Sequence, residues 1–349
     1  MARIKVAVIG LGNVACTILQ GIEYYRQGLN GKRGIWHEMV GNYSIDDVDV
    51  VGAFDIDASK VGRSVADALR MFGKGNGNSI NTDVYKDLNV SAGIMVDKPP
   101  EHWSMDITRV DRDEFIDALK RCNADVVVNL ISSSLDASSL AYAESSLQAG
   151  VSFINATPFS LQSNHGLIDA FRDRRLLIVG DDLMSQFGGT VFHKGILQLL
   201  HRRGMIIDSS YQLDVGGSSD TRNTLREAVR ARKRAIQTAS IDAELPYEFG
   251  ITAGTTEYTE FLKDERVSYY WFYAEGFMGS PVRIDVMMRS SDGANACNIL
   301  LDVIRAVKYA RDKNSPDLAE IISAYGFKSP PRVMSMMDAQ QKFEEVFVF

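Results

Sequence analysis

Residues 4–28 read IKVAVIGLGNVACTILQGIEYYRQG, and this stretch decides the fold class. A β-branched apolar run is followed by a glycine turn and then by apolar residues at helical spacing, which predicts strand, turn and helix. Gly10, Gly12 and Ala15 form the pattern G-x-G-x-x-A between that strand and that helix. In this context a pyrophosphate can approach the backbone at Gly12 and lie on the positive end of the helix. A tight turn without a ligand has the same pattern, so the motif alone is a hypothesis.

The alternation of apolar strands with helical stretches continues to about residue 189, which predicts a doubly wound parallel sheet with right-handed crossovers. Residues 73–111 are rich in Gly, Asn and Pro and fit no period, so we expect a surface excursion there. Gly150 is expected to end a helix. Further strands are predicted at 48–57, 124–134, 151–158 and 176–182, and helices at 113–123, 136–150 and 165–175.

The pattern changes after Gly189. A helix at 190–204 leads to strands whose alternation is typical of a half-exposed antiparallel sheet. These strands are predicted at 206–217, 267–277 and 281–291, and a helix follows at 298–313. The sequence therefore predicts a nucleotide-binding domain that is interrupted or followed by an α+β domain.

The composition excludes several classes of function. The chain has 349 residues and a formal net charge of −7, which opposes general binding to nucleic acid or to a membrane surface. Three scattered cysteines indicate neither a disulfide framework nor a zinc knuckle, and the five histidines lack metal spacing, so we predict no metal site. The chain passes almost directly from Met1 into a strand and has no long apolar run, so we expect a cytoplasmic enzyme.

Acids and serines at the ends of predicted strands are candidate cofactor ligands. Asp55 or Asp57 can take the ribose hydroxyls of a dinucleotide, and an acid there favours NAD over its 2′-phosphorylated form. Their distance from the glycines exceeds the usual spacing of about 20 residues, and the polar insertion at 29–49 accounts for the excess. Ser132 and Ser133 end another strand, where they line a cofactor groove or simply cap a helix.

Residues 216–237, GGSSDTRNTLREAVRARKRAIQ, concentrate positive charge in an acidic chain. Three partners compete for that charge: an anionic small molecule, nucleic acid, or only water. Side chains of one helix point around its whole circumference, so we expect two or three of the six cations to face a site. The six are Arg222, Arg226, Arg230, Arg232, Lys233 and Arg234.

Eight blocks of the sequence resemble, in order and nearly end to end, the archaeal and actinobacterial form of the inositol-1-phosphate synthase family. The blocks are VIGLGNVACTILQGIEYY (8–25), AFDIDASKVG (53–62), INATP (154–158), IVGDDLMSQFGGTVFHKGIL (178–197), YQLDVGGSSDTRN (211–223), FLKDERVSYY (261–270), GSPVRIDVMMRSSDGANACNILLDVIRAVKYARD (279–312) and AYGFKSPP (324–331).

The resemblance implies an α/β architecture and an activity. It implies a Rossmann-like NAD-binding domain formed by residues 1–189 and 295–349, and a catalytic α+β domain at 190–294 that also builds a homotetramer. It implies NAD that is regenerated in each turnover. The substrate would be a hexose 6-phosphate, which is oxidised at C5, enolised at C6, closed by aldol attack and reduced again.

Site residues follow from the same resemblance. Lys233 matches the first of two lysines in a helix and Lys328 the lysine of KSPP, while Asp220 matches the acid after VGG. Asp302 matches a position near the nicotinamide, although a salt bridge to Arg305 on its own helix is an equal alternative. The implied cofactor-binding residues are Gly10, Gly12, Asn13, Val14, Asp55, Asp57, Ser132, Ser133, Thr157, Asp182 and Asp302.

This chain departs from the family pattern at chemically important positions. Gln237 replaces the second helical lysine, Arg266 the lysine of DDRK, Met184 the lysine after GDD, and Ser218 the asparagine of GGN. Glutamine cannot shuttle a proton and arginine stays charged, so these changes alter the chemistry. We assign Lys233 to the C5 oxygen and Lys328 to the acceptor oxygen. Arg266 is expected to hold a phosphate or oxyanion, and Gln237 to orient a hydroxyl.

Three functions remain open at this point. The preferred one is a cyclase that converts fructose 6-phosphate to a five-membered carbocyclic phosphate, because the same C6 enolate would attack the C2 ketone. Such a product suits secondary metabolism. The second is a conventional inositol-1-phosphate synthase acting on glucose 6-phosphate. The third is a NAD-sensing protein without catalysis.

Overall fold

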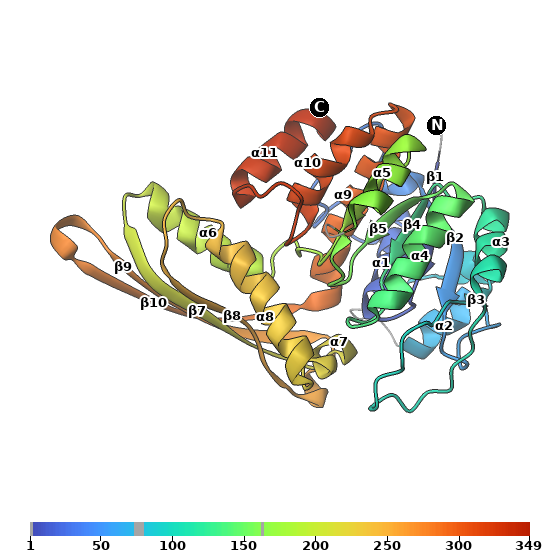
Figure 1. Cartoon of the computed structure of the whole chain (residues 1–349), viewed down its shortest axis with the longest axis horizontal. Coiled ribbons are helices and arrows are strands. Elements are labelled where there is room, and N and C mark those ends of the chain that lie inside the picture. The colour runs from blue at the N-terminus through green and yellow to red at the C-terminus, as the bar shows by residue number, and fades with distance from the viewer. Residues whose placement is uncertain (1–2, 73–79, 162–163) are drawn as a thin grey trace.

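The computed structural model describes residues 3–72, 80–161 and 164–349, which form two sheets with their helices (Figure 1). The first sheet has six parallel strands in the order β3-β2-β1-β4-β5-β6. This is the strand order of a dinucleotide-binding Rossmann fold and confirms the predicted fold class. Its strands are β1 (Ile4–Ile9), β2 (Val48–Asp55), β3 (Val90–Ala92), β4 (Val126–Asn129), β5 (Ser152–Asn155) and β6 (Ile178–Gly180).

Helices cover both faces of this sheet because alternate strand residues point to opposite faces. Val6 and Val8 pack in one core with helices α1, α2, α9, α10 and α11, while Ala7 and Ile9 pack in a second core with α3, α4 and α5. The bounds are α1 (Asn13–Arg26), α2 (Val65–Phe72), α3 (Arg112–Cys122), α4 (Asp136–Ala149), α5 (His165–Asp173), α9 (Asp292–Asp312), α10 (Ala319–Gly326) and α11 (Met336–Phe347). Gly150 ends α4 in the left-handed conformation at φ 77°, as predicted.

The second sheet has four strands in the order β10-β9-β7-β8. Strand β9 runs antiparallel to β7 and β10, whereas β7 and β8 are parallel. Helices α6 and α8 cover one face, where Tyr270 and Phe272 are buried, and leave the other face bare (Figure 1). The elements are β7 (Ile206–Gly216), β8 (Gly250–Tyr258), β9 (Glu265–Glu275), β10 (Pro281–Ser291), α6 (Gly189–Arg202), α7 (Ser219–Asn223) and α8 (Glu227–Asp242).

Two strands were missed by the sequence analysis. Strand β3 lies inside the stretch 73–111 that was predicted to be a surface excursion, and it pairs with β2 through Val90 and Ala53. Three residues are too few to show a period, so the stretch was misread; its part 73–79 lies outside the described residues. Strand β8 was also not predicted, because GITAGTTEY lacks apolar alternation.

The connections between the two sheets bear on the domain boundaries. Helix α6 begins at Gly189, and α9 begins at Asp292 and returns the chain to the first sheet. We propose that the boundaries between the two domains lie at 189/190 and 294/295. Within the described ranges, no helix combines the length and apolar character needed to cross a membrane.

Candidate active site

The glycine turn after β1 exposes the N-terminus of α1. Gly10 has φ 85°, and a Cβ atom there would lie 3.0 Å from the Leu130 carbonyl oxygen, so glycine is required. Gly12 precedes the helix with φ −89°, and a Cβ atom there would meet no other heavy atom within 4 Å. Gly12 at the N-cap has no side chain to cap α1, so among the described residues the first N–H groups of the helix are available to an anion.

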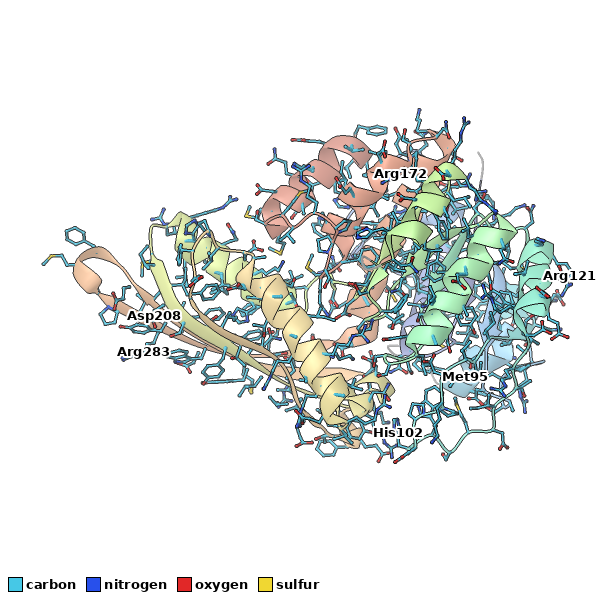
Figure 2. The ribbon with its side chains drawn as sticks, viewed as in Figure 1. Met95, His102, Arg121, Arg172, Asp208 and Arg283 are labelled. Carbon is cyan, nitrogen blue, oxygen red and sulfur yellow. The ribbon has the colours of Figure 1, made fainter. Side chains whose placement is uncertain are left out.

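A groove of about 320 Å³ lies above this turn, at the carboxyl ends of β1, β2 and β4. The strand order reverses between β1 and β4, which is where open α/β sheets bind ligands. Figure 2 shows Met95 and His102 at the side of the first sheet that faces α7. The groove is lined by Gly10, Gly12, Asp55, Ile56, Lys60, Ile94, Met95, His102, Trp103, Ser104, Met105, Leu130, Ile131, Ser132, Leu135, Ser138, Tyr142 and Arg222.

Of the two candidate ribose ligands, the structure places Asp55 in the groove. Its Oδ2 accepts the Leu11 N–H at 2.7 Å and a bond from Lys60 Nζ at 3.2 Å, so this carboxylate also orders the glycine turn. Asp57 does not line the groove, and its Oδ1 accepts the N–H of Ser59 at 2.9 Å. Burial alone would raise the pKa of Asp57, but the bonds from Ser59 and Lys60 lower it overall.

The other predicted cofactor ligands divide into groove residues and core residues. Ser132 lines the groove. Asn13 lies at the start of α1, where its Nδ2 donates to Asp264 Oδ1 at 3.3 Å. Val14 packs against the core, and the carbonyl of the buried Thr157 accepts a bond from Asn155 at 2.9 Å. Neither Val14 nor Thr157 presents a polar side chain to the groove.

Helix α7 docks on the β4–α4 loop and brings Asp220 to Lys233. The Ser133 N–H donates to Asp220 Oδ1 at 3.3 Å, and Asn223 Nδ2 donates to the Ser133 carbonyl at 3.4 Å. Lys233 Nζ forms an ion pair with Asp220. Burial opposes ionisation of Asp220, but Lys233 and Ser133 hold its pKa well below the usual range. Gln237 lies one turn after Lys233 on α8 and is half-buried.

Lys233 borders a cavity of about 380 Å³ that Ser133, Pro158, Arg226 and Arg232 also line. Ser133 follows β4 and Pro158 follows β5, so this cavity lies at the same carboxyl edge of the first sheet as the 320 Å³ groove. We call the 320 Å³ groove the dinucleotide groove, after the ligand expected there. Helix α8 therefore brings Lys233 to the edge of the first sheet that holds the glycine turn.

Lys328 reaches this edge from the C-terminal part of the chain. Its Nζ donates to Asp182 Oδ2 at 2.8 Å, and its N–H donates to the Asp182 carbonyl at 2.9 Å. The neighbouring Asp181 is 2% exposed and lies within electrostatic reach of both Lys328 and Arg232. Arg232 borders the same 380 Å³ cavity as Lys233. Asp181 therefore interacts electrostatically with Lys328 itself and with a neighbour of Lys233.

Asp181 gives the protein a testable pH dependence. Burial raises the pKa of Asp181 to about 7, although the hydrogen bond that its carboxylate accepts from the Asp182 N–H opposes the rise. Because the folded pKa exceeds the unfolded one, the associated stability is present below about pH 4 and is lost as the pH rises through 7, by up to about 4 kcal/mol. Replacing Asp181 by Asn should flatten this part of the stability curve, as measured by urea unfolding at pH 5 and pH 8.

The matched control for that variant is Asp208→Asn, because Asp208 is exposed on the outer part of β7 (Figure 2). We expect it to keep the wild-type slope. An equal loss of stability between pH 5 and pH 8 in wild type and the Asp181→Asn variant would contradict the assignment.

Arg266 is not free to hold a phosphate, which corrects the role assigned to it from the sequence. Its Nε and Nη2 donate to Asp292 at 2.7 to 2.9 Å, and its Nη1 lies 3.5 Å from Asp214 Oδ2. Burial alone would lower the pKa of Arg266, but Asp292 and Asp214 raise it overall. Arg266 therefore ties β9 to β7 and to the start of α9.

Asp302 is also not brought to the cofactor groove. It is fully buried, and its carboxylate contacts His37 Nδ1 at 2.7 Å, Tyr325 OH at 2.6 Å and Arg305 at 2.5 Å. The alternative of a salt bridge to Arg305 is the observed arrangement. Asp302 therefore stabilises the packing of α9 against α10 and the 37–43 segment rather than contacting the nicotinamide.

Four of the six cations at 222–234 border cavities that face the first sheet, against the two or three expected. Arg222 borders the dinucleotide groove, and Arg226, Arg232 and Lys233 border the 380 Å³ cavity. Arg230 and Arg234 border a shallow groove on the outer side of α8, against β8. Four of the six cations therefore lie on concave surfaces that face the first sheet.

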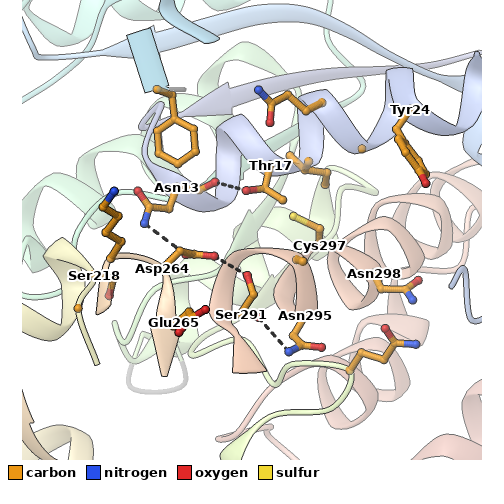
Figure 3. A pocket seen from close by; sticks show the side chains of 18 of the residues that line it. Asn13, Thr17, Tyr24, Ser218, Asp264, Glu265, Ser291, Asn295, Cys297 and Asn298 are labelled. Atoms are coloured by element: carbon orange, nitrogen blue, oxygen red, sulfur yellow. Dashed lines mark hydrogen bonds between the residues drawn. The ribbon is translucent and has the colours of Figure 1, made fainter. Parts of the chain in front are cut away.

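A larger cavity of about 1250 Å³ opens between α1, the segment 258–265 and the start of α9 (Figure 3). Asp264 joins its walls: Oδ1 accepts from Asn13, and Oδ2 accepts from Ser291 Oγ at 2.6 Å and from the Gly293 N–H at 3.2 Å. Asp264 lies in the stretch FLKDERVSYY, but its role is not predictable from that stretch, because its partners Asn13, Ser291 and Gly293 are distant in sequence.

Comparisons with known proteins agree with this geometry. A family profile described as myo-inositol-1-phosphate synthase matches residues 188–293. The inositol-3-phosphate synthase of Mycobacterium tuberculosis is 30% identical over 99% of this chain and 96% of its own length. That of Corynebacterium glutamicum is 29% identical over 99% of both chains.

Solved structures give the same result. The crystal structure of Ari2 has 26% identity and a TM-score of 0.78, with 99% of this chain and 98% of that chain covered. A myo-inositol-1-phosphate synthase-related protein from Thermotoga maritima has a TM-score of 0.84 at 18% identity over 98% of both chains, which shows the fold alone. The 30% identity between this chain and the Mycobacterium tuberculosis enzyme, over 99% of this chain, shows that the chain belongs to the inositol-phosphate synthase family.

Proposed function

We propose that the protein is a NAD-dependent cyclase that converts fructose 6-phosphate to a five-membered carbocyclic phosphate. One observation carries the proposal: Lys233 and Lys328, each paired with an acid, lie at the carboxyl edge of the sheet that bears the dinucleotide groove. Two cations beside a redox cofactor suit a reaction that forms oxygen anions at two carbons in turn.

The residues present fit NAD. The uncapped N-terminus of α1 and the open space at Gly12 accept a diphosphate, and Asp55 lies at the end of β2, where a ribose would be held. When bound, NAD supplies a hydride acceptor for C5 of the sugar and a hydride donor for the ring ketone formed later.

Lys233 serves the oxygen at C5. Its neutral amine accepts the hydroxyl proton when C5 is oxidised, and the resulting ammonium group donates a hydrogen bond to the C5 oxygen and returns the proton on reduction. Asp220 is held ionised beside it, so the pair stays compact while the oxygen changes charge. Gln237 on the same face of α8 orients a neighbouring hydroxyl.

Lys328 serves the acceptor carbonyl. The C5 ketone makes the C6 proton acidic, and transfer of that proton to the Asp182 carboxylate beside Lys328 leaves an enolate whose C6 attacks C2. A C6–C2 bond forms, the C2 oxygen becomes an alkoxide, and Lys328 stabilises it until it takes a proton. No atom is gained or lost overall, so the reaction is an isomerisation.

Two substitutions favour a ketose over glucose 6-phosphate. Met184 is 6% exposed and replaces a family lysine with an apolar side chain, and Gln237 replaces a second lysine with a neutral amide. Without these two cations, the active site stabilises negative charge on the substrate at positions different from those in the family pattern. We therefore expect a different acceptor carbon, and the C2 ketone of fructose 6-phosphate lies within reach of the same C6 enolate.

The proposal is tested by incubating the protein and NAD separately with fructose 6-phosphate and glucose 6-phosphate, and identifying the products by NMR and mass spectrometry. A cyclopentane phosphate from fructose 6-phosphate supports the proposal. Formation of an inositol phosphate from glucose 6-phosphate would instead indicate a conventional inositol-1-phosphate synthase. NAD binding without turnover of either sugar would support a sensor.

We also propose a homotetramer built on the bare face of the second sheet. Tyr211 and Trp271 stack there with ring centroids 5.5 Å apart, and Met287 is 66% exposed. Arg283, which Figure 2 labels, lies 5.5 Å from the Tyr273 centroid. Exposed aromatic and aliphatic side chains on this face, with Arg283 among them, support its use as a subunit interface. Light scattering should give four times the chain mass, and Trp271→Glu should reduce it; a monomeric wild type would contradict the proposal.

A further inference from the structure

Arg222 borders two cavities at once and has no acidic ion-pair partner among the described residues. Its side chain borders both the 320 Å³ groove, with Gly12 and Asp55, and the 1250 Å³ cavity, with Asn13. It therefore lies across from the exposed N-terminus of α1.

The helix that carries Arg222 is held in place from both sides of that residue. Asp220 accepts the Ser133 N–H, and Asn223 donates to the Ser133 carbonyl, so α7 is bound to the β4–α4 loop. The guanidinium contacts the Tyr258 ring at 6.0 Å from the centroid. Among the described residues, no carboxylate lies within ion-pair distance of Arg222, whereas its neighbours Arg230, Arg232 and Lys233 each have one.

A second group in the groove also lacks a partner. His102 lines the same groove, and its buried Nε2 has no hydrogen-bond partner in the described part of the chain. Burial lowers the pKa of His102, and the positive charges of Arg222 and Arg226 lower it further. The two guanidinium groups therefore add positive potential at this edge of the groove. An anion bound between Gly12 and Arg222 would balance that potential.

We propose that Arg222 binds the diphosphate of the dinucleotide, opposite the N-terminus of α1. This inference rests on the proposed function, and it adds that a residue of the catalytic domain closes the cofactor site of the other domain. A guanidinium fork makes charge-assisted, bidentate bonds to phosphate oxygens, which ordinary lysine cannot reproduce.

The test uses two variants of Arg222 and one control. Arg222→Met keeps an aliphatic contact with Tyr258 but removes the charge, and Arg222→Lys keeps the charge but loses the fork. Arg234→Met removes a cation from the outer side of α8 and is the matched control. Affinities for NAD, for ADP-ribose and for fructose 6-phosphate are measured by calorimetry on the full chain.

We expect Arg222→Met to weaken NAD and ADP-ribose equally, by about 10- to 100-fold, because both carry the diphosphate. Arg222→Lys should lose less, and Arg234→Met should match wild type. Unchanged NAD affinity in Arg222→Met would overturn the inference, and so would weaker binding of the sugar phosphate alone. If the wild-type protein binds NAD but turns over neither sugar, the proposed function is wrong, and the affinities of the Arg222 variants still test the role of Arg222. If the wild-type protein binds no dinucleotide, both the proposed function and the role of Arg222 are wrong.

Discussion

We expect the Lys233→Ala variant to form product about 10³-fold more slowly and to form no reduced NAD. Lys233 is assigned to the C5 oxygen, so the first oxidation stops when it is removed. Replacing Lys328 by alanine should also abolish the product but permit that oxidation, because Lys328 is assigned to the aldol step. Absorbance of reduced nicotinamide in a single turnover separates the two cases.

The control for these variants is Arg234→Ala, which removes a cation one residue after Lys233 on the outer side of α8. We expect wild-type turnover from it. All variants should bind NAD with wild-type affinity, since neither lysine borders the dinucleotide groove. Normal turnover in the Lys233 or Lys328 variant would refute the role of that lysine, and reduced nicotinamide in the Lys233 variant would reverse the order assigned to them.

Replacing Gly12 by valine is expected to weaken NAD binding by more than about 100-fold while the protein stays folded. The backbone of Gly12 has φ −89°, which valine adopts without strain, and a Cβ atom there would meet no protein atom within 4 Å outside the two neighbouring residues. It would instead occupy the space through which the diphosphate approaches α1. Calorimetry measures the affinity, and the melting temperature confirms the fold.

Gly10 and Gly195 provide contrasting controls. Gly10→Ala should lower the melting temperature, because φ is 85° and its Cβ would approach the Leu130 carbonyl. Gly195→Val on α6 meets open space far from the groove and should leave NAD affinity unchanged. Wild-type NAD affinity in Gly12→Val would show that the dinucleotide does not use this turn.

Local patterns were sufficient to predict most of the fold. The G-x-G-x-x-A turn and the apolar strands 48–57, 124–134 and 176–182 each carry their signal within a few residues. Strand β3 has three residues and β8 has mixed composition, so pairing with neighbours rather than local preference makes them strands.

The candidate site was less predictable because its charges are set by distant partners. Arg266 matched a catalytic position, but the sheet brings Asp214 and the start of α9 to it, and both neutralise it. Asp302 matched a cofactor position, but its side chain is enclosed by Tyr325 and the 37–43 segment. Sequence spacing shows which residues are charged, and only the fold shows which charges remain free.

The central claim is that one protein removes and then restores a hydride at the same carbon while a ring closes. It is tested most directly with fructose 6-phosphate that carries deuterium at C5, incubated with the protein and NAD. We predict a cyclopentane phosphate that retains one deuterium, with no accumulation of reduced cofactor. A cyclic product without deuterium, or deuterium that remains on released cofactor while the sugar stays open, would contradict the account.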